Sequence, residues 1–353
     1  MCFNKIFITF FFITSLLLGQ KFDLKSYVKF GYDSNPMKLS ENEINESLND
    51  IFLDKYNINS QYFKLSLKLK TSKKIFKRKT KLEFEFKRNI YKNLDQKTNF
   101  GVSFKLDQPL GSYQHIKFYY SYVPDIFLRE FNDEAFSNYY YEVEEPLDVE
   151  SLNAFECYFN LGKVRIVYES PYLINKSKIS IGYTYETQFY NKYFTEFDLR
   201  INGIQVSYLA NKSAINSSYN ISYFYNYAAN ITLNDDNPHR SFMNRGYTEN
   251  GLKLSYEFKV PKFKVGMSFK GIYRQYRSHI EQDKLHYNRE HSDIVFSIWG
   301  GFKIDKLNQK INLSHRTRNT SSPENWVEDL KTFNRIDLSY TIYFNKISFR
   351  NKK

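Results

Sequence analysis

Apolar and polar residues alternate along most of this chain. In residues 61–71 every second side chain is apolar, and lysine or serine stands between the apolar positions. The apolar set is Phe63, Leu65, Leu67 and Leu69, and the polar set is Lys64, Ser66, Lys68 and Lys70. Because a β-strand has a side-chain period of two, this segment has one apolar and one charged face. Repeated along a chain, the pattern is typical of a barrel with lipid outside and water inside.

The same alternation predicts about fourteen strands. We expect them at residues 22–33, 61–71, 79–92, 98–107, 113–123, 151–169, 176–189, 194–210, 214–228, 249–260, 262–277, 289–304, 308–318 and 333–344. An even number of strands is usual for a single-chain bacterial barrel. The sequence therefore predicts an all-β protein whose antiparallel sheet closes into a transmembrane barrel.

One expected strand changes phase. In residues 194–210, the apolar positions up to Ile201 share one face, and those from Ile204 onward share the other. Asn202-Gly203 lies between them and could form a tight hairpin turn or a β-bulge. A hairpin would leave a strand of about six residues, shorter than the roughly 9–11 that a membrane-spanning strand needs. We therefore expect a bulge, with the hairpin as the alternative.

The expected connections alternate in length. Short ones fall at residues 107–112, 170–175, 211–213, 261 and 305–307, and long ones at 33–60, 124–150, 230–247, 278–288 and 319–332. Outer-membrane barrels have short turns on the periplasmic rim and long loops on the external rim. Both chain termini then fall on the periplasmic side.

Residues 1–19 have the layout of a signal peptide. Lys5 precedes an apolar or hydroxyl-bearing run from Ile6 to Leu18, and Gly19 is a plausible cleavage position. The run is short for a membrane helix, which needs about 20 apolar residues, although a retained anchor is the alternative. We expect an exported protein in which residues 20–353 form a single barrel domain.

Composition agrees with a barrel. The chain has 31 Tyr, 33 Phe and 2 Trp, and barrels place aromatic girdles at both membrane boundaries. The net charge of +13 comes mostly from lysines that alternate within expected strands. One basic run joins two strands and is interpreted as a solvated turn, not a nucleic-acid site; it contains Lys73, Lys74, Lys77, Arg78 and Lys79. A soluble all-β secreted protein is the main structural alternative.

The last expected strand carries a terminal pattern. Asp337, Ile342 and Phe344 occupy its polar, apolar and aromatic positions, and Ser339 stands where the pattern has glycine. This strand resembles the signal read by the outer-membrane assembly machinery of Gram-negative bacteria, and residues 31–36 resemble the openings of several outer-membrane barrel families. The resemblance implies a porin-like barrel in the outer membrane. Its partners would be the assembly machinery, outer-membrane lipid and lipopolysaccharide.

Signatures of catalysis are scarce in the sequence. It contains no Gly-x-Ser-x-Gly elbow, no His-Glu-x-x-His motif, no phosphate-binding glycine loop and no cysteine pair in the mature part. Ser314-His315 and His291-Ser292 are adjacent in expected strands, so the two side chains of each pair point to opposite faces. We expect no catalytic residues, no metal site and no cofactor.

The expected inward positions are rich in lysine. The candidate pore-lining residues are Lys64, Lys68, Lys81, Glu83, Glu85, Lys87, Lys105, Lys117, Lys253, Lys259, Lys264 and Lys270. An excess of fixed positive charge in a water-filled pore raises the local anion concentration and repels cations. The alternative is that these lysines pair with neighbouring carboxylates and only solvate the interior.

The connection at residues 124–150, the third on the external side, is acidic. It contains Asp133, Glu134, Glu142, Glu144 and Glu145 among other acids, and Arg129 is its one basic residue. In porins the third external loop commonly folds inward and narrows the pore, so these five acids are candidates for a constriction. The alternatives are a solvated loop or one that holds divalent ions among lipopolysaccharide phosphates.

The sequence thus favours a porin-like passive channel for small solutes with a mild anion preference. The second hypothesis is an assembly, secretion or adhesion barrel with a plugged lumen and loops that bind a partner. A rim hydrolase is the weakest alternative. The solute and the oligomeric state are not specified by these patterns.

Overall fold

A computed structural model describes residues 21–49, 58–131, 155–172, 177–192, 194–212, 216–232, 243–305 and 307–350. The predicted signal peptide at residues 1–19 lies outside the described residues. So does most of the third external connection, at residues 132–154. In the described part of the chain, no helix has the length and apolar character needed to cross a membrane.

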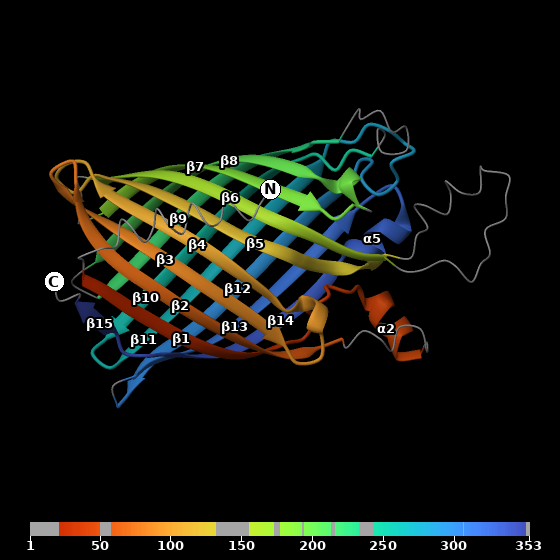
Figure 1. Ribbon diagram of the computed structural model, residues 1–353. Coiled ribbons are helices and arrows are strands. Elements are labelled where there is room, and N and C mark those ends of the chain that lie inside the picture. Colours follow the sequence, from red (N-terminus) through yellow and green to blue (C-terminus); the bar gives the residue numbers. More distant parts are fainter. Residues whose placement is uncertain are drawn as a thin grey trace.

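Fourteen long antiparallel strands form one closed barrel (Figure 1). They are β1 (Lys21–Asp33), β2 (Ser60–Ile75), β3 (Arg78–Tyr91), β4 (Asn99–Pro109), β5 (His115–Phe131), β6 (Phe155–Tyr172), β7 (Ser177–Tyr190), β8 (Leu199–Lys212), β9 (Ser217–Asn230), β10 (Tyr247–Val260), β11 (Phe263–Tyr276), β12 (Glu290–Ile304), β13 (Leu307–Ser321) and β14 (Phe333–Tyr343). Each strand pairs with its neighbours in the sequence, and β14 pairs with β1 to close the sheet. The predicted all-β barrel and its strand number are confirmed.

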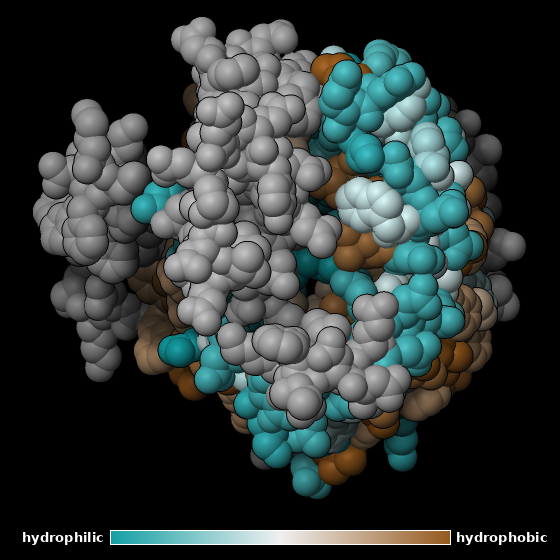
Figure 2. Space-filling model, turned by 90° about the vertical axis from the view of Figure 1, so that its right-hand side faces the viewer, coloured by the Kyte–Doolittle hydropathy of each residue, from teal (hydrophilic) through white to brown (hydrophobic). Residues whose placement is uncertain are grey.

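The two faces of the sheet differ as the alternation predicts. Outward positions carry large apolar side chains that remain about half exposed in the isolated chain, such as Ile181, Ile204 and Ile294. Leaving such a side chain in water costs roughly 1.5–3 kcal/mol relative to burying it. Figure 2 views the rim of the long connections and shows hydrophilic residues over the rim and hydrophobic ones on the flank. The outside of the barrel therefore suits lipid, as in outer-membrane β-barrels.

The short turns and the long connections lie on opposite rims. At the short-turn rim, residues Phe76 and Lys77 join β2 to β3 with φ of 49° and 62°, and a short strand β15 (Ile347–Arg350) pairs with the start of β1. The opposite rim carries α2 (Glu41–Asn49), η1 (Asp95–Lys97), η3 (Thr195–Phe197) and α5 (Asn325–Lys331). This arrangement confirms the predicted alternation of short turns and long loops.

The predicted bulge at Asn202-Gly203 is wrong, and so is the alternative hairpin. β8 pairs with β7 and β9 in one unbroken register through both residues. The phase change has another cause. Leu199 and Ile201 point into the lumen and are buried there, whereas Ile204 points outward and is 56% exposed. The apolar residues switch faces because the lumen itself contains an apolar cluster at this end of the barrel.

The irregularities of the sheet lie instead in β5. Its pairing with β6 shifts register between Val123 and Ile126 and again between Phe127 and Glu130. Pro124 has no amide hydrogen to donate to a ladder, and Asp125 has a φ of 47°, so the strand bulges here. The sequence prediction ended this strand at Val123 and began a loop at Pro124. That boundary is wrong, because the strand continues to Phe131.

Candidate functional site: the lumen and its mouth

The inward face of the sheet lines a polar lumen. All twelve candidate pore-lining residues occupy the positions that alternate with the outward apolar ones: Lys64, Lys68, Lys81, Glu83, Glu85, Lys87, Lys105, Lys117, Lys253, Lys259, Lys264 and Lys270. The structure divides this set into two walls with different charge. Strands β2–β7 form one wall, and β10–β13 form part of the other.

Several lysines on the wall of β2–β7 contact carboxylates. Glu83 binds Lys68 at 2.9 Å and Lys70 at 2.5 Å. Glu85 binds Lys87 at 3.1 Å. Further along the wall, Lys117 and Lys178 share Glu169 at 2.7 and 2.9 Å, and Lys163 binds Glu186 at 2.9 Å. Six lysines on this wall thus pair with carboxylates, whereas Lys64, Lys81 and Lys105 have no carboxylate within 4.0 Å among the described residues.

On the wall of β10–β13, Lys259 binds Glu257 at 3.1 Å, but four other inward lysines have no such partner among the described residues. Lys253 lies directly opposite Lys270 in the register of β10 and β11. Among the described residues, no carboxylate lies within 4.0 Å of Lys253, Lys264, Lys270 or Lys310. Lys270 lies 4.9 Å from the ring centre of Phe224, and Lys310 lies 4.4 Å from that of Trp299. We call these four lysines the positive wall.

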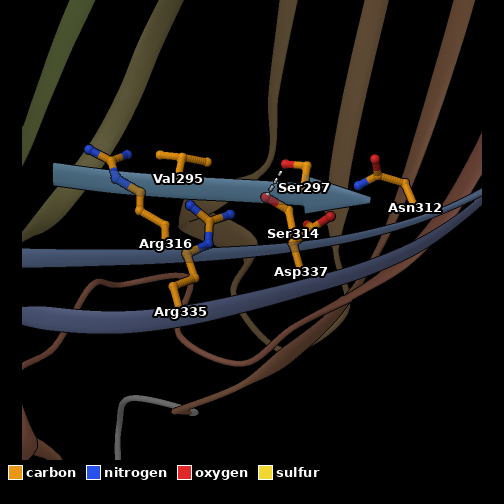
Figure 3. A pocket seen from close by; sticks show the side chains of 7 residues that line it. All are labelled: Val295, Ser297, Asn312, Ser314, Arg316, Arg335 and Asp337. Atoms are coloured by element: carbon orange, nitrogen blue, oxygen red, sulfur yellow. Dashed lines mark hydrogen bonds between the residues drawn. The ribbon is translucent and has the colours of Figure 1, made fainter. Parts of the chain in front are cut away.

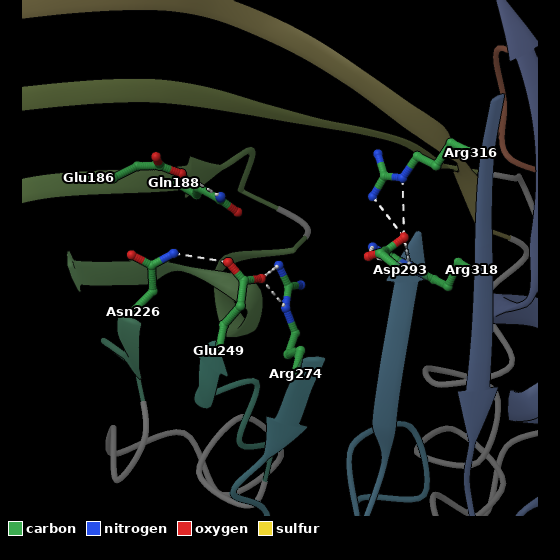
Figure 4. Close-up of polar contacts among 8 residues, drawn as sticks. All are labelled: Glu186, Gln188, Asn226, Glu249, Arg274, Asp293, Arg316 and Arg318. Carbon is green, nitrogen blue, oxygen red and sulfur yellow. Dashed lines mark hydrogen bonds and ion pairs between the residues drawn. The ribbon is translucent and has the colours of Figure 1, made fainter. Parts of the chain in front are cut away.

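Three carboxylates anchor arginines towards the long-connection end of the lumen, and Figure 4 shows two of them, Glu249 and Asp293. Glu249 accepts hydrogen bonds from Nε and Nη2 of Arg274, at 2.9 and 2.6 Å. Asp293 binds both Arg316 and Arg318, with Nη2 atoms at 3.0 and 2.7 Å. Asp33 of β1 binds Arg335 of β14 in the same two-bonded manner. These arginines are not among the residues predicted from the sequence, although their inward positions on β11, β13 and β14 follow from the same alternation.

A recess of about 310 Å³ opens on the lumen face of β12–β14 (Figure 3). We call it the β12–β14 recess; its lining residues are Val295, Ser297, Asn312, Ser314, Arg316, Arg335 and Asp337. The two guanidinium groups lie at one end, and the hydroxyl, carboxylate and amide groups lie at the other. Seven side chains from three adjacent strands thus form one polar surface with a cationic end.

The mouth at the long-connection rim is crossed by the segment that follows β1. Met37 and Leu39 of this segment pack against Leu94 and Phe127, and Arg129 of β5 binds Glu43 of α2 at 2.7 Å. Near its start, the segment is hydrogen-bonded to the backbone of β14. Because β2, β3 and β4 separate β1 from β5, the first external connection spans part of the opening.

Lys97 of η1 links the second external connection to β5 at this side of the mouth. Its Nζ donates to the carbonyl oxygens of Phe127 and Leu128, at 2.9 and 3.1 Å, and lies 5.4 Å from the ring centre of Phe127. Burial lowers the pKa of the Lys97 ammonium to about 7, and the nearby Arg129 charge acts in the same direction. The amine therefore loses its proton more readily than the amine of an exposed lysine.

The segment between β11 and β12 narrows the mouth from another side. Asp283 and His286 of this segment are buried, and Nδ1 of His286 donates to Oδ1 of Asp283 at 2.8 Å. The His286 ring contacts the rings of Tyr276 and Phe197 at centroid distances of 5.5 and 6.0 Å. Burial lowers the pKa of His286 to about 4, which the Asp283 carboxylate opposes. This segment covers the apolar cluster that contains Leu199.

The candidate constriction residues Asp133, Glu134, Glu142, Glu144 and Glu145 lie outside the described residues. Phe127, which the sequence analysis placed in the same loop, belongs to β5 and is buried against the first external connection. In the described part of the chain, the first and sixth external connections pack over the mouth. The sequence analysis did not single them out.

The residues of the terminal pattern lie on both faces of β14. Asp337 and Ser339 face the lumen, where Asp337 accepts a hydrogen bond from Tyr62 Oη at 2.8 Å. Ile342 and Phe344 belong to the outward set, and the Phe344 amide bonds to the Ser26 carbonyl at 3.0 Å. The chain then continues into β15, so the aromatic residue is not terminal.

The described residues contain no group of three or more His, Cys, Asp or Glu side chains that could hold a metal ion. Ser314 of the pair Ser314-His315 lines the recess, whereas His315 lies on the outward face of β13. His291 faces inward and its ring bonds to Thr320 Oγ1 at 2.9 Å. The adjacent serine–histidine pairs are thus divided between the two faces, as predicted.

No protein-family model and no curated protein sequence matches this chain. Among solved structures, it is similar to the outer-membrane channel DcaP of Acinetobacter baumannii, with a TM-score of 0.50 and 9% identity over 92% of this chain and 98% of that chain. The loop-deletion mutant of the outer-membrane protein OmpT of Vibrio cholerae matches with a TM-score of 0.45 and 6% identity, over 92% and 100% of the chains. An anion-selective porin from Comamonas acidovorans matches with a TM-score of 0.41 and 8% identity, over 92% of this chain and 98% of that chain. The similarity to the DcaP channel shows that this chain has the fold of outer-membrane β-barrels.

Proposed function

We propose that this barrel is a porin-like passive channel for small solutes, with a mild preference for anions and no enzymatic activity. The observation that carries the proposal is the positive wall. Lys253, Lys264 and Lys270 face the lumen, and no described carboxylate lies within 4.0 Å of them. Facing them, the lysines of β2–β7 are mostly paired.

Fixed charge in a confined aqueous space acts on every ion that enters it. An unpaired lysine attracts anions and repels cations, and the low-dielectric barrel wall focuses its field into the lumen. A lysine that pairs with a glutamate of its own contributes much less, because the pair is nearly neutral at a distance, whereas two lysines on one glutamate leave a net charge of +1. The expected preference is mild, since only part of the lumen carries uncompensated charge.

Planar bilayers containing the purified barrel test this proposal. With a tenfold KCl gradient across the bilayer, we expect steady conductance and a reversal potential of the sign that anion permeation gives. A reversal potential of the opposite sign would overturn the anion preference. The absence of conductance in the bilayer, together with no swelling of proteoliposomes in solutions of small sugars, would overturn the proposal that the barrel is a channel.

One observation favours the second candidate function, a plugged barrel whose loops bind a partner in assembly, secretion or adhesion. The segments after β1 and between β11 and β12 both pack over the mouth through buried apolar clusters. A plugged barrel would be silent in both transport assays. It would conduct only after these segments are displaced.

The closed barrel with an apolar outside belongs in the outer membrane, where lipid solvates that surface. Contact with lipopolysaccharide and insertion by the outer-membrane assembly machinery are part of the proposal. The terminal pattern Asp337, Ser339, Ile342 and Phe344 supports the second of these. We also retain a cleaved signal peptide at residues 1–19 and a single barrel domain over residues 20–353.

A further inference from the structure

Two arginines of the β12–β14 recess lie directly opposite each other. Arg316 of β13 and Arg335 of β14 are register partners, and both point into the lumen. Like charges at directly opposite positions of an antiparallel pair destabilise a sheet. Such a pair is therefore a candidate for binding a negative group.

In each arginine, one edge of the guanidinium group binds a carboxylate, and the remaining Nη1 group has no described partner. Arg316 uses Nε and Nη2 to bind Asp293 of β12, whereas Arg335 uses the same two atoms to bind Asp33 of β1. Neither Nη1 group donates to any described residue. The two carboxylates fix the guanidinium planes and leave the Nη1 donors for a ligand in the lumen. An oxyanion that accepts hydrogen bonds from both Nη1 groups would also offset the electrostatic repulsion between the two arginines.

The other end of the recess has a different chemistry. Ser314 lies two residues from Arg316 on β13 and opposite Asp337 on β14, and its hydroxyl accepts a hydrogen bond from Ser297 at 2.9 Å. Two residues along a strand span about 6.8 Å. A ligand of that length can place an anionic group on the arginines and hydroxyl groups against Ser314 and Asp337. Val295 is the one apolar side chain in the lining, so the recess does not favour an apolar body.

We propose that the β12–β14 recess is a binding site for small hydroxylated oxyanions, such as sugar acids or sugar phosphates. The anionic group lies between Arg316 and Arg335, and hydroxyl groups donate to Asp337 and to Ser314, whose own hydroxyl donates to the Phe296 carbonyl at 3.3 Å. This inference deepens the proposed function, since it names a class of solute for the channel. Binding is expected to be weak, because a site along a permeation path must release its solute.

Trp299 provides a readout that is independent of transport. It lies directly opposite Asn312, which lines the recess, and the other tryptophan, Trp326, lies in α5. In a Trp326→Phe background, emission therefore reports on the lumen beside the recess. Gluconate and glucose 6-phosphate serve as the carboxylate and phosphate probes, and glucose serves as the uncharged one.

We expect a saturable change of Trp299 emission with gluconate or glucose 6-phosphate and none with glucose. Arg316→Gln should weaken the apparent affinity at least fivefold. This variant is expected to fold, because Arg318 still binds Asp293 through Nε and Nη2. Ser314→Ala should weaken the affinity of both anionic probes without altering the arginines. Lys117→Gln, on the paired wall, is the matched control and should bind like the parent.

The absence of a saturable change with either anion would overturn the site. So would an unchanged response in Arg316→Gln, which would place the anion elsewhere, for example on Lys310 above the Trp299 ring. Conductance in KCl is measured on the same preparations. A barrel that binds gluconate in detergent but is silent in bilayers would overturn the channel proposal and support the site. A barrel that conducts but shows no fluorescence response would overturn the site and support the channel proposal.

Discussion

Asp33 and Arg335 form a two-bonded ion pair across the seam of the barrel. Arg335 Nε donates to Asp33 Oδ1 at 2.8 Å, and the Asp33 side chain has no exposed surface. The two residues lie at the ends of β1 and β14 that face the long connections. The pair therefore joins strands that are more than 300 positions apart in the sequence.

Asp33→Asn should destabilise the barrel by about 3 kcal/mol, because it removes one partner of a buried charge pair and leaves Arg335 uncompensated. The free energy of unfolding from urea titrations in detergent measures the effect. Asp23→Asn is the matched control: Asp23 binds Lys346 at 3.2 Å at the exposed end of the same seam, so its loss should cost well under about 1 kcal/mol. Equal losses in both variants would contradict the role assigned to burial.

Gly266 supports Trp299 by leaving room for its ring. The two residues are register partners on β11 and β12, and a Cβ on Gly266 would lie 2.2 Å from Cε2 of the Trp299 ring. Gly266→Ala should therefore tilt the ring, change its emission and cost about 1–3 kcal/mol of stability. Gly271→Ala on the outward face of β11 is the control, because its Cβ would meet Phe269 at an ordinary 3.6 Å. A Gly266→Ala barrel with parental emission and stability would show that the ring is not held by this contact.

Much of this fold could be predicted from the sequence because lipid and water select opposite faces of each strand. The alternation located the strands and placed residues such as Lys68 and Lys253 in the lumen. It failed at Leu199 and Ile201, where the lumen side is buried under a folded-in connection and is no longer aqueous. It also failed at Pro124, where a bulge lets a strand pass a residue that cannot donate a backbone hydrogen bond.

The pairing of side chains could not be predicted in the same way. Arg316 and Arg335 are both recognisable as inward residues, but their opposition depends on the register between β13 and β14. Which lysines are neutralised depends equally on register, because Glu83 binds a lysine two rows away as well as its direct partner. Counting the inward lysines along the sequence therefore overestimates the uncompensated positive charge that lines the pore.

Changing the paired wall should raise the anion preference. Glu83→Gln releases Lys70 and leaves Lys68 with Glu85 alone, at 3.6 Å, so the ratio of anion to cation permeability should rise by about twofold. Lys253→Gln removes one charge from the positive wall and should lower the ratio. Reversal potentials in a KCl gradient measure both. If the two variants shift selectivity in the same direction, the assignment of the two walls is wrong.

The acidic third external connection stays a prediction from the sequence. Deleting residues 133–145 removes Asp133, Glu134, Glu142, Glu144 and Glu145 but leaves β5 and its buried Phe127 intact. If the loop folds inward, single-channel conductance should rise several-fold. A deletion of similar length at residues 233–242, in the fifth external connection, controls for shortening a loop. Unchanged conductance in the first deletion would show that this loop does not constrict the pore.

Acid should loosen the segment between β11 and β12. His286 has a pKa of about 4 while it is buried against Tyr276 and Phe197, but about 6.5 once exposed. The opened segment therefore binds more protons than the closed one between these two values, and opening becomes more favourable as the pH falls from 6.5 to 4. Asp283 partly compensates the charge, whereas Arg289 and Arg245 oppose it.

Hydrogen exchange of the segment at residues 278–289 measures this opening. The protection factor should fall by up to roughly a hundredfold over that pH interval, as the difference between a pKa of about 4 in the closed segment and one of about 6.5 in the opened segment allows. His286→Gln stays neutral at every pH, so its protection should be nearly constant, even if lower at pH 7. His315→Gln, on the outward face of β13, should behave like the parent. If His286→Gln kept the parental pH dependence, another group would control this side of the mouth, with Asp283 the first to examine because it shares the buried hydrogen bond.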